Sequence, residues 1–179
     1  MLKIRTFQND DLQLLERWLH KEYIEKWFEV PNVCTIDDWL YEVKNRDGEF
    51  AWINYFIVLW EDCPIGFCCY YRCVDAKEDW YGNTPLDGAY SIDYLIGEES
   101  YLGKGLGKKM VAELVKMILH AKNAKSIIVQ PDKRNKVSCN ILLSNGFILD
   151  ESNNIYNKST EVKKGLSINE DIMFISKRV

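Results

Sequence analysis

The sequence has no long uninterrupted run of apolar residues. No stretch of the 179 residues approaches the roughly 18 to 20 apolar residues in a row that a membrane-spanning helix needs. The first residues, Met1–Phe7, alternate as in a strand, and no charged-then-apolar leader precedes them. We therefore expect a cytoplasmic protein with no membrane partner.

The sequence also lacks the cysteine and histidine spacing of a metal or thiol centre. None of its six cysteines forms a C-x-x-C pair, and the adjacent Cys68 and Cys69 would point to opposite faces of a strand. The two histidines, His20 and His120, are not placed to pair with a catalytic cysteine. We expect reduced, buried thiols and no metal site.

The sequence also has no excess of basic residues. The formal net charge is −4 and the sequence pI is about 5.3, which argues against nucleic acid as a partner. From residue 75 to residue 99 the chain has one base, Lys77, and seven acids: Asp75, Glu78, Asp79, Asp87, Asp93, Glu98 and Glu99. This acidic stretch is either a field that attracts cations or an ordinary solvated loop.

The residues that are present favour one α+β domain over residues 1–179. Apolar residues make up 47% of the chain and aromatic residues 13%, enough for a core. Apolar periodicity predicts helices within 9–19, 35–43, 108–121 and 137–145, and strands at 2–6, 51–60, 67–74, 89–96, 126–129, 147–150 and 171–176. The polar run 151–166 is expected to be a loop. No internal repeat or linker divides the chain.

Three glycines alternate with other residues directly before a predicted helix. We call this segment, Leu102-Gly-Lys-Gly-Leu-Gly-Lys108, the glycine loop. Glycine lets the backbone approach a ligand, and free amides at a helix start bind anions with help from the helix dipole. Lys104, Lys108 and Lys109 add positive charge. The loop predicts a phosphate or pyrophosphate ligand.

Two common nucleotide-binding loops do not fit this spacing. Counted from Gly103, a Walker loop needs glycine where Lys108 stands and a hydroxyl residue where Met110 stands. The dinucleotide fingerprint also needs glycine at position 108. The glycine loop is therefore either an anion-binding loop of another kind or a flexible turn.

Four motifs follow one another from strand to strand in the second half of the chain. They are Ile92-Asp-Tyr-Leu-Ile-Gly97, the glycine loop with its helix, Gln130-Pro-x-x-x-Asn135, and Asn145-Gly-Phe147. In this order they resemble the GNAT N-acetyltransferases, and among these the aminoglycoside 6′-N-acetyltransferases. The resemblance is strongest from about Ala51 to Phe147. It implies the GNAT fold: a mixed, mostly antiparallel central sheet, splayed at the cofactor strand and flanked by helices.

The resemblance implies acetyl-coenzyme A as cosubstrate. In the family, the glycine loop cradles the pyrophosphate, the strand before it pairs with the pantetheine arm, and an asparagine lies near the cofactor. The implied cofactor-binding residues are Tyr94, Leu95, Ile96, Leu102, Gly103, Lys104, Gly105, Leu106, Gly107, Lys108 and Asn135.

Asp93 is the candidate catalytic residue. Acetylation needs a neutral amine, so a carboxylate or a water chain must take a proton from the ammonium form. Aspartate is uncommon within strands, and alternation puts Asp93 on the face opposite Ile92 and Tyr94. It is either the base, as the matching aspartate of the aminoglycoside enzymes is proposed to be, or a solvated side chain.

The same resemblance, together with the acidic stretch, predicts a polycationic acceptor. Aromatic side chains could stack on sugar rings while acidic side chains attract their amines. The expected substrate-binding residues are Trp27, Phe28, Glu78, Asp79, Trp80, Tyr81 and Asp93. Each aromatic could equally belong to the core.

The chain departs from the family pattern near the acceptor. Leu142 stands where the family often has a tyrosine that protonates the departing thiolate, and Gln130 stands where it usually has an acid. Water or another hydroxyl could replace the tyrosine, or the thiol, with a pKa of about 8.5, needs no such help.

We therefore expect a resistance enzyme that acetylates the 6′-amine of aminoglycosides by direct attack of the amine on the thioester, as a monomer or homodimer. The alternatives are an N-acetyltransferase for a polyamine, an amino-acid derivative or a protein amine, and a non-catalytic acyl-coenzyme A-binding module.

Overall fold

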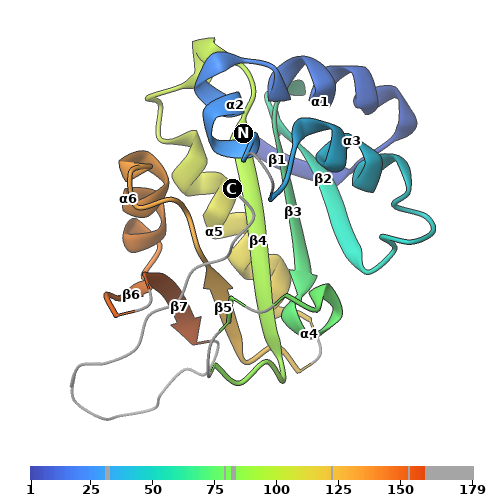
Figure 1. Cartoon of the computed structure of the whole chain (residues 1–179). Helices are drawn as coiled ribbons and strands as arrows, with labels where there is room; N and C mark the ends of the chain where they lie inside the picture. The colour runs from blue at the N-terminus through green and yellow to red at the C-terminus, as the bar shows by residue number, and fades with distance from the viewer. Residues whose placement is uncertain (31–32, 79, 82–83, 122, 153, 160–179) are drawn as a thin grey trace.

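The fold is seen in a computed structural model that describes residues 1–30, 33–78, 80–81, 84–121, 123–152 and 154–159. Within these ranges, seven strands form one sheet in the order β1-β2-β3-β4-β5-β7-β6 (Figure 1). The strands are β1 Leu2–Thr6, β2 Ile53–Trp60, β3 Cys63–Arg72, β4 Ala89–Ile96, β5 Ser126–Val129, β6 Ile148–Asp150 and β7 Ile155–Ser159. The α-helices are α1 Leu12–Leu19, α2 Glu22–Phe28, α3 Ile36–Lys44, α4 Cys73–Ala76, α5 Leu106–Leu119 and α6 Lys136–Ser144, with 3₁₀ turns η1 Asn9–Asp11 and η2 Glu99–Tyr101.

The sheet is mostly antiparallel, as predicted. All neighbouring strands pair antiparallel except β4 and β5, which are parallel and are connected through α5. Parallel strands need such a crossover because the chain must return to the same end of the sheet. The GNAT fold expected from the sequence is confirmed.

Both faces of the central strands are covered, which explains their nearly continuous apolar sequences. One core lies between the sheet and helices α1, α2 and α3, and a second lies between the other face and helices α5 and α6 (Figure 1). Neighbouring residues of a strand alternate between these cores: Ile57 and Cys69 belong to the first, Val58 and Cys68 to the second. The prediction that Cys68 and Cys69 face opposite ways is therefore confirmed.

Side-chain caps set two helix starts that matter below. Thr35 Oγ1 accepts a hydrogen bond from the Asp38 amide at 3.2 Å, and Asp38 Oδ2 accepts one from the Thr35 amide at 2.8 Å. This reciprocal pair is a capping box, and it begins the helix predicted at 35–43, which is α3. Asn135 caps α6, where its Oδ1 accepts a hydrogen bond from the Ser138 amide at 3.1 Å.

Two sequence-based expectations differ from the structure, and a third concerns residues that it does not describe. The second hairpin strand ends at Arg72 and not at Val74, because residues from Cys73 turn into the short helix α4. The run 151–166 was expected to be a loop, but its residues 155–159 form β7, which completes the pairing of β5 and β6. The strand expected at 171–176 lies outside the described residues.

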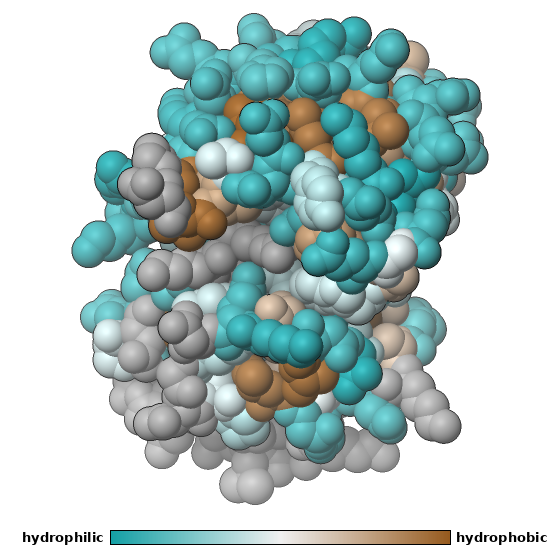
Figure 2. All heavy atoms as spheres, turned by 45° about the vertical axis from the view of Figure 1, so that its right-hand side comes forward, coloured by the Kyte–Doolittle hydropathy of each residue, from teal (hydrophilic) through white to brown (hydrophobic). Residues whose placement is uncertain are grey.

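The face of the molecule drawn in Figure 2 is largely hydrophilic where its residues are described. Figure 2 shows one face, on which apolar residues gather in a few small patches among polar ones. Of the helices in the described part of the chain, none has the length and apolar character needed to cross a membrane.

Candidate active site

The edge of β4 that faces β5 is open over most of its length. The two strands pair only at Ala89–Ser126 and Tyr90–Ile127. β4 nevertheless runs on to Ile96, and among the described residues no strand covers this edge from Ser91 onward. An uncovered edge offers backbone N–H and C=O groups to an extended ligand. The splay expected at the cofactor strand is present, and Tyr94, Leu95 and Ile96 lie along it.

The glycine loop follows β4 and leads into α5. Gly103 and Gly105 both have φ of +70°, a left-handed conformation that glycine adopts without the Cβ strain of other residues. A Cβ at either position would have no atom within 4 Å, so the backbone here is open to a ligand. Gly105 is the N-cap of α5, and no side chain caps the helix. The amides of the first turn, from Leu106 to Lys108, can therefore bind an anion.

Helix α6 packs closely against this loop. A Cβ on Gly107 would lie 2.8 Å from Ile141 Cδ1, so glycine permits the close approach of α5 and α6. The side chain of Asn145 donates a hydrogen bond to the Lys108 carbonyl at 3.2 Å. The first turn of α6, which follows Asn135, lies beside β4, where the Tyr94 hydroxyl is 2.7 Å from Ser138 Oγ. Because Asn135 Oδ1 is engaged in the helix cap, its amide nitrogen is the atom that it offers to a ligand.

Residues from four parts of the chain meet in one pocket beside the open edge. Its lining residues are Trp27 and Phe28 of α2, Ile92, Asp93 and Tyr94 of β4, Val129, Gln130 and Pro131 at the end of β5, and Asn135 and Ser138 at the start of α6. Five of the residues that the sequence predicted for the site are among them: Trp27, Phe28, Asp93, Tyr94 and Asn135. The pocket thus joins a candidate base, candidate acceptor contacts and candidate cofactor contacts.

Asp93 is buried at this pocket, with a relative exposure of 7%. It is not the solvated aspartate that the alternative reading of the sequence allowed. The Cys69 thiol, on the neighbouring strand β3, lies 3.6 Å from Asp93 Oδ2 and donates a weak hydrogen bond to it. Alternation holds as predicted, because Asp93 lies on the α1–α3 face of the sheet while Ile92 and Tyr94 belong to the core on the other face.

Helix α2 is fixed over the end of β4. Lys21 Nζ and the Tyr23 hydroxyl both donate to the Gly97 carbonyl, at 2.7 Å and 2.9 Å. Burial, together with the nearby carboxylates of Glu99 and Glu98, raises the pKa of Tyr23 to about 12, so the phenol stays a donor at physiological pH. This anchor sets the place of Trp27 and Phe28, and Phe28 packs on Trp39 with ring centroids 5.2 Å apart.

Trp80 and Tyr81 do not line this pocket. Their rings lie 3.9 Å apart, and Tyr81 is buried against Cys73, Ala89 and Ile128, near the opposite end of β4 from α2. Glu78 accepts hydrogen bonds from both, at 2.7 Å from Trp80 Nε1 and 2.8 Å from the Tyr81 hydroxyl. Burial and the nearby Tyr71 phenol raise the pKa of Tyr81. Asp79 lies outside the described residues.

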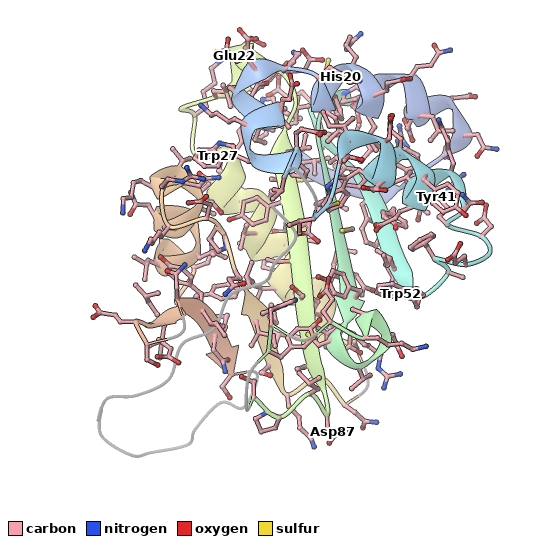
Figure 3. All side chains as sticks on the ribbon, viewed as in Figure 1. His20, Glu22, Trp27, Tyr41, Trp52 and Asp87 are labelled. Carbon is pink, nitrogen blue, oxygen red and sulfur yellow. The ribbon has the colours of Figure 1, made fainter. Side chains whose placement is uncertain are left out.

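The acids of the 75–99 stretch that the structure describes do not form one patch. Asp87, at the far end of β4 from Trp27, pairs with Lys125 (Figure 3). At the other end, Glu98 accepts hydrogen bonds from Trp18 Nε1 at 2.8 Å and from Arg17 at 2.9 Å. Much of the predicted acidic field is therefore used within the protein.

Cys69, Ser138 and the apolar wall of the pocket were missed by reasoning from sequence. Ser138 lies one helical turn after Asn135, so its spacing alone could have placed it on the same face of α6. Cys69 could not be found this way because its contact with Asp93 depends on the register between β3 and β4. Leu142, at the position of the family's tyrosine, is fully buried in the core.

In the described part of the chain, no group of three or more His, Cys, Asp or Glu side chains is arranged to hold a metal ion.

Curated relatives of the chain are aminoglycoside 6′-acetyltransferases. The "Aminoglycoside N(6')-acetyltransferase type 1" proteins of Klebsiella pneumoniae and of Serratia marcescens are each 26% identical over 137 residues, which is 74% of this chain. The match spans 66% of the length of those relatives.

Solved structures share the fold. The aminoglycoside acetyltransferase AAC(6')-Ib in complex with coenzyme A superposes with a TM-score of 0.74 at 22% identity, covering 89% of this chain and 95% of that one. The spermidine N-acetyltransferase of Vibrio cholerae, in complex with coenzyme A and spermine, gives a TM-score of 0.64 at 16% identity over 83% of this chain and 82% of that one.

A family model for the acetyltransferase (GNAT) domain matches residues 8–154, which includes the open edge of β4, the glycine loop and the start of α6. The cosubstrate of this family, acetyl-coenzyme A, has the extended arm and the pyrophosphate that these features fit. The chain belongs to the GNAT acetyltransferase family.

Proposed function

We propose that the chain is an acetyl-coenzyme A-dependent N-acetyltransferase that acetylates the 6′-amine of aminoglycosides. The observation that carries the proposal is the placement of Asp93. A buried carboxylate lies at a pocket shared by the open edge of β4 and the aromatic residues of α2. The curated relatives support the acceptor class.

Different groups of the chain bind the cosubstrate and activate the amine. The open edge of β4 holds the pantetheine arm, the first-turn amides of α5 hold the pyrophosphate, and Asn135 donates from its side-chain amide. Acetyl-coenzyme A supplies the activated acetyl group. Asp93 takes a proton from the amine that enters on the α2 side, so the neutral nitrogen can attack the carbonyl carbon.

Charge and shape support a cationic acceptor that carries flat ring faces. The carboxylate of Asp93 attracts an ammonium group before it takes the proton. Trp27 and Phe28 line the same pocket and can pack on a sugar ring. Glu78, held between Trp80 and Tyr81 on the same side of the sheet as Asp93, is a second carboxylate for an amine farther along the molecule.

The test is turnover against a panel of amines with acetyl-coenzyme A as donor. We expect saturable release of coenzyme A with kanamycin A and little with spermidine at the same concentration. Saturable turnover of spermidine with none of kanamycin would instead assign the chain to polyamines. Tight binding of acetyl-coenzyme A with no turnover of any amine would make it an acyl-coenzyme A-binding module.

A further inference from the structure

Two hydroxyl groups meet at the pocket on the opposite face of β4 from Asp93. The Tyr94 hydroxyl lies 2.7 Å from Ser138 Oγ, and both residues line the pocket that Asp93 also lines. Asp93 and Tyr94 are neighbours in the strand and so point to opposite faces. Because β5 splays away here, groups on both faces reach the same opening. An amine on the Asp93 side would thus have the hydroxyl pair on the far side of the thioester.

Whichever of the two hydroxyls donates within the pair, one hydroxyl hydrogen remains available. Burial raises the pKa of Tyr94, and this outweighs the opposite effect of its hydrogen bond with Ser138, so the phenol stays protonated. The phenol can then donate to Ser138 Oγ, which leaves the hydrogen of the Ser138 hydroxyl for another acceptor. The Ser138 backbone is held by Asn135 Oδ1.

We infer that Ser138 donates its hydroxyl proton to the sulfur of coenzyme A as the acetyl group is transferred, and that Tyr94 is the positioning residue that aims this hydroxyl. The inference rests on the proposed acetyl transfer but not on the identity of the amine. It gives the leaving group a donor in a chain where Leu142 is apolar and fully buried.

A hydrogen-bond donor to the sulfur has a larger effect in this pocket because the pocket wall is apolar. Ile92, Val129 and Pro131 line it beside the hydroxyl pair. A thiolate that forms against these groups loses water, and an unpaired charge in such surroundings is costly. A hydroxyl donor placed in advance stabilises the charge where it develops.

The proposed step balances. The amine nitrogen bonds to the carbonyl carbon, the C–S bond breaks, and its electron pair passes to sulfur. Asp93 takes one proton from the ammonium before the attack and passes it to solvent. It takes the second proton from the nitrogen as the C–S bond breaks, while the sulfur takes one from Ser138. Asp93 then returns this second proton to solvent and Ser138 regains one from solvent, so the net products are the amide, the free thiol and one proton.

The first experiment measures the acidity of the thiol of coenzyme A bound to the enzyme, without any amine. The ultraviolet absorbance of the thiolate is followed against pH and referenced to the complex with acetyl-coenzyme A, whose sulfur does not titrate. The proteins compared are the wild type, Ser138→Ala, Tyr94→Phe and, as control, Ser144→Ala. The Ser144 hydroxyl lies on the same helix but is exposed and donates to the Ile141 carbonyl at 2.9 Å.

We expect Ser138→Ala to lower the acid dissociation constant of the bound thiol by about tenfold, the effect of removing a hydrogen bond to a charged group. Tyr94→Phe should give a smaller change in the same direction, and Ser144→Ala none. Titratable groups that face Tyr94 are Asp93 of the same strand, Cys139 of α6 and Tyr156 of β7. All remain in every variant, so the comparison isolates the hydroxyl.

The second experiment measures turnover with whichever amine the wild type acetylates. For Ser138→Ala we expect kcat to fall by about tenfold or more, with affinity for acetyl-coenzyme A within twofold of the wild type. An unchanged thiol titration in Ser138→Ala overturns the inference, even if that variant is less stable or binds coenzyme A more weakly. Failure of kanamycin as a substrate would overturn the proposed acceptor only, because the thiol titration needs no acceptor.

Discussion

The two sides of β4 are built in different ways. On the cofactor side, one continuous stretch, residues 91–138, supplies the open strand edge, the glycine loop and the start of α6. The groups that these features present to a ligand are largely backbone amides and carbonyls. On the acceptor side, the side chains beside Asp93 come from α2 and β3, which lie far apart in the sequence.

This difference separates recognition by backbone from recognition by side chains. A pyrophosphate and an extended arm need amides, carbonyls and room, which glycine and a strand edge provide whatever the neighbouring side chains are. An amine acceptor needs particular carboxylates and rings at particular places. The cofactor side should therefore respond to changes in backbone conformation, and the acceptor side to changes of single side chains.

The largest effect is expected at Asp93. Asp93→Asn keeps the shape of the side chain but removes the base, so turnover should fall by about 10²- to 10⁴-fold. Affinity for acetyl-coenzyme A, measured by isothermal titration calorimetry, should stay within twofold. The control is Asp47→Asn, whose side chain is 91% exposed. Unchanged turnover in Asp93→Asn would remove this residue from the mechanism, and weakened cofactor binding would break the division between the two sides.

The next effect is expected in the glycine loop. At Gly105 the backbone has φ of +70°, where a Cβ costs about 1–2 kcal/mol. Gly105→Ala should therefore weaken acetyl-coenzyme A binding by roughly 5- to 30-fold while leaving the KM for the amine unchanged. Gly48→Ala is the matched control, because its Cβ would only touch the Asn45 carbonyl at 3.7 Å. Equal cofactor affinity in both variants contradicts a backbone cradle.

A smaller effect is expected at Glu78. Glu78→Gln keeps an acceptor for Trp80 and Tyr81 but removes the negative charge. For an aminoglycoside we expect KM to rise by up to about fivefold, the scale of a partly exposed ion pair. Cofactor affinity should not change, and Glu61→Gln in the exposed hairpin turn should have no effect. An unaltered KM would mean that Glu78 only supports its two aromatic neighbours.

The smallest effect concerns Glu98, which connects α1 to the end of β4. Burial disfavours its charge, but hydrogen bonds from Trp18, Arg17 and Lys21 and the charge of Lys21 outweigh this and hold its pKa below the usual 4.5. Because the pKa is lower in the folded state, the ionised group stabilises the fold above about pH 4.5, and this stabilisation is lost as the pH falls through the folded value.

Glu98→Gln should therefore lower the Tm at pH 7 by about 2 °C. The difference from the wild type should shrink as the pH drops below 4.5. Thermal melts followed by circular dichroism at several pH values measure it. A Tm difference that does not depend on pH would show that the charge of Glu98 contributes nothing.

Much of the fold could be predicted from the sequence because its signals are local. Apolar periodicity located most of the elements in their order, including the helix predicted at 35–43, which is observed as α3. The errors lie where tertiary contacts decide. β7 forms from a polar segment because β5 and β6 need a partner between them, and β3 ends at Arg72 where the chain turns into α4.

The same distinction between local signals and tertiary contacts applies to the candidate site. The glycine loop could be read directly, since its signal is a spacing within seven residues. The aromatic residues could not be sorted from sequence: Trp27 and Phe28 reach the pocket, whereas Tyr81 is buried near the other end of β4. Ser138 and Cys69 were missed because their roles depend on which groups the splay and the register bring near Asp93 and Tyr94.

The central claim is that Asp93 activates one particular amine of an aminoglycoside against bound acetyl-coenzyme A. Neomycin and paromomycin test it most directly, because they differ only by an amine or a hydroxyl at the 6′ position of one ring. Mass spectrometry and NMR of the products should show neomycin with a single acetyl group on the 6′-nitrogen and paromomycin unmodified. Acetylation of both at another shared amine, or of neither, would contradict the claim.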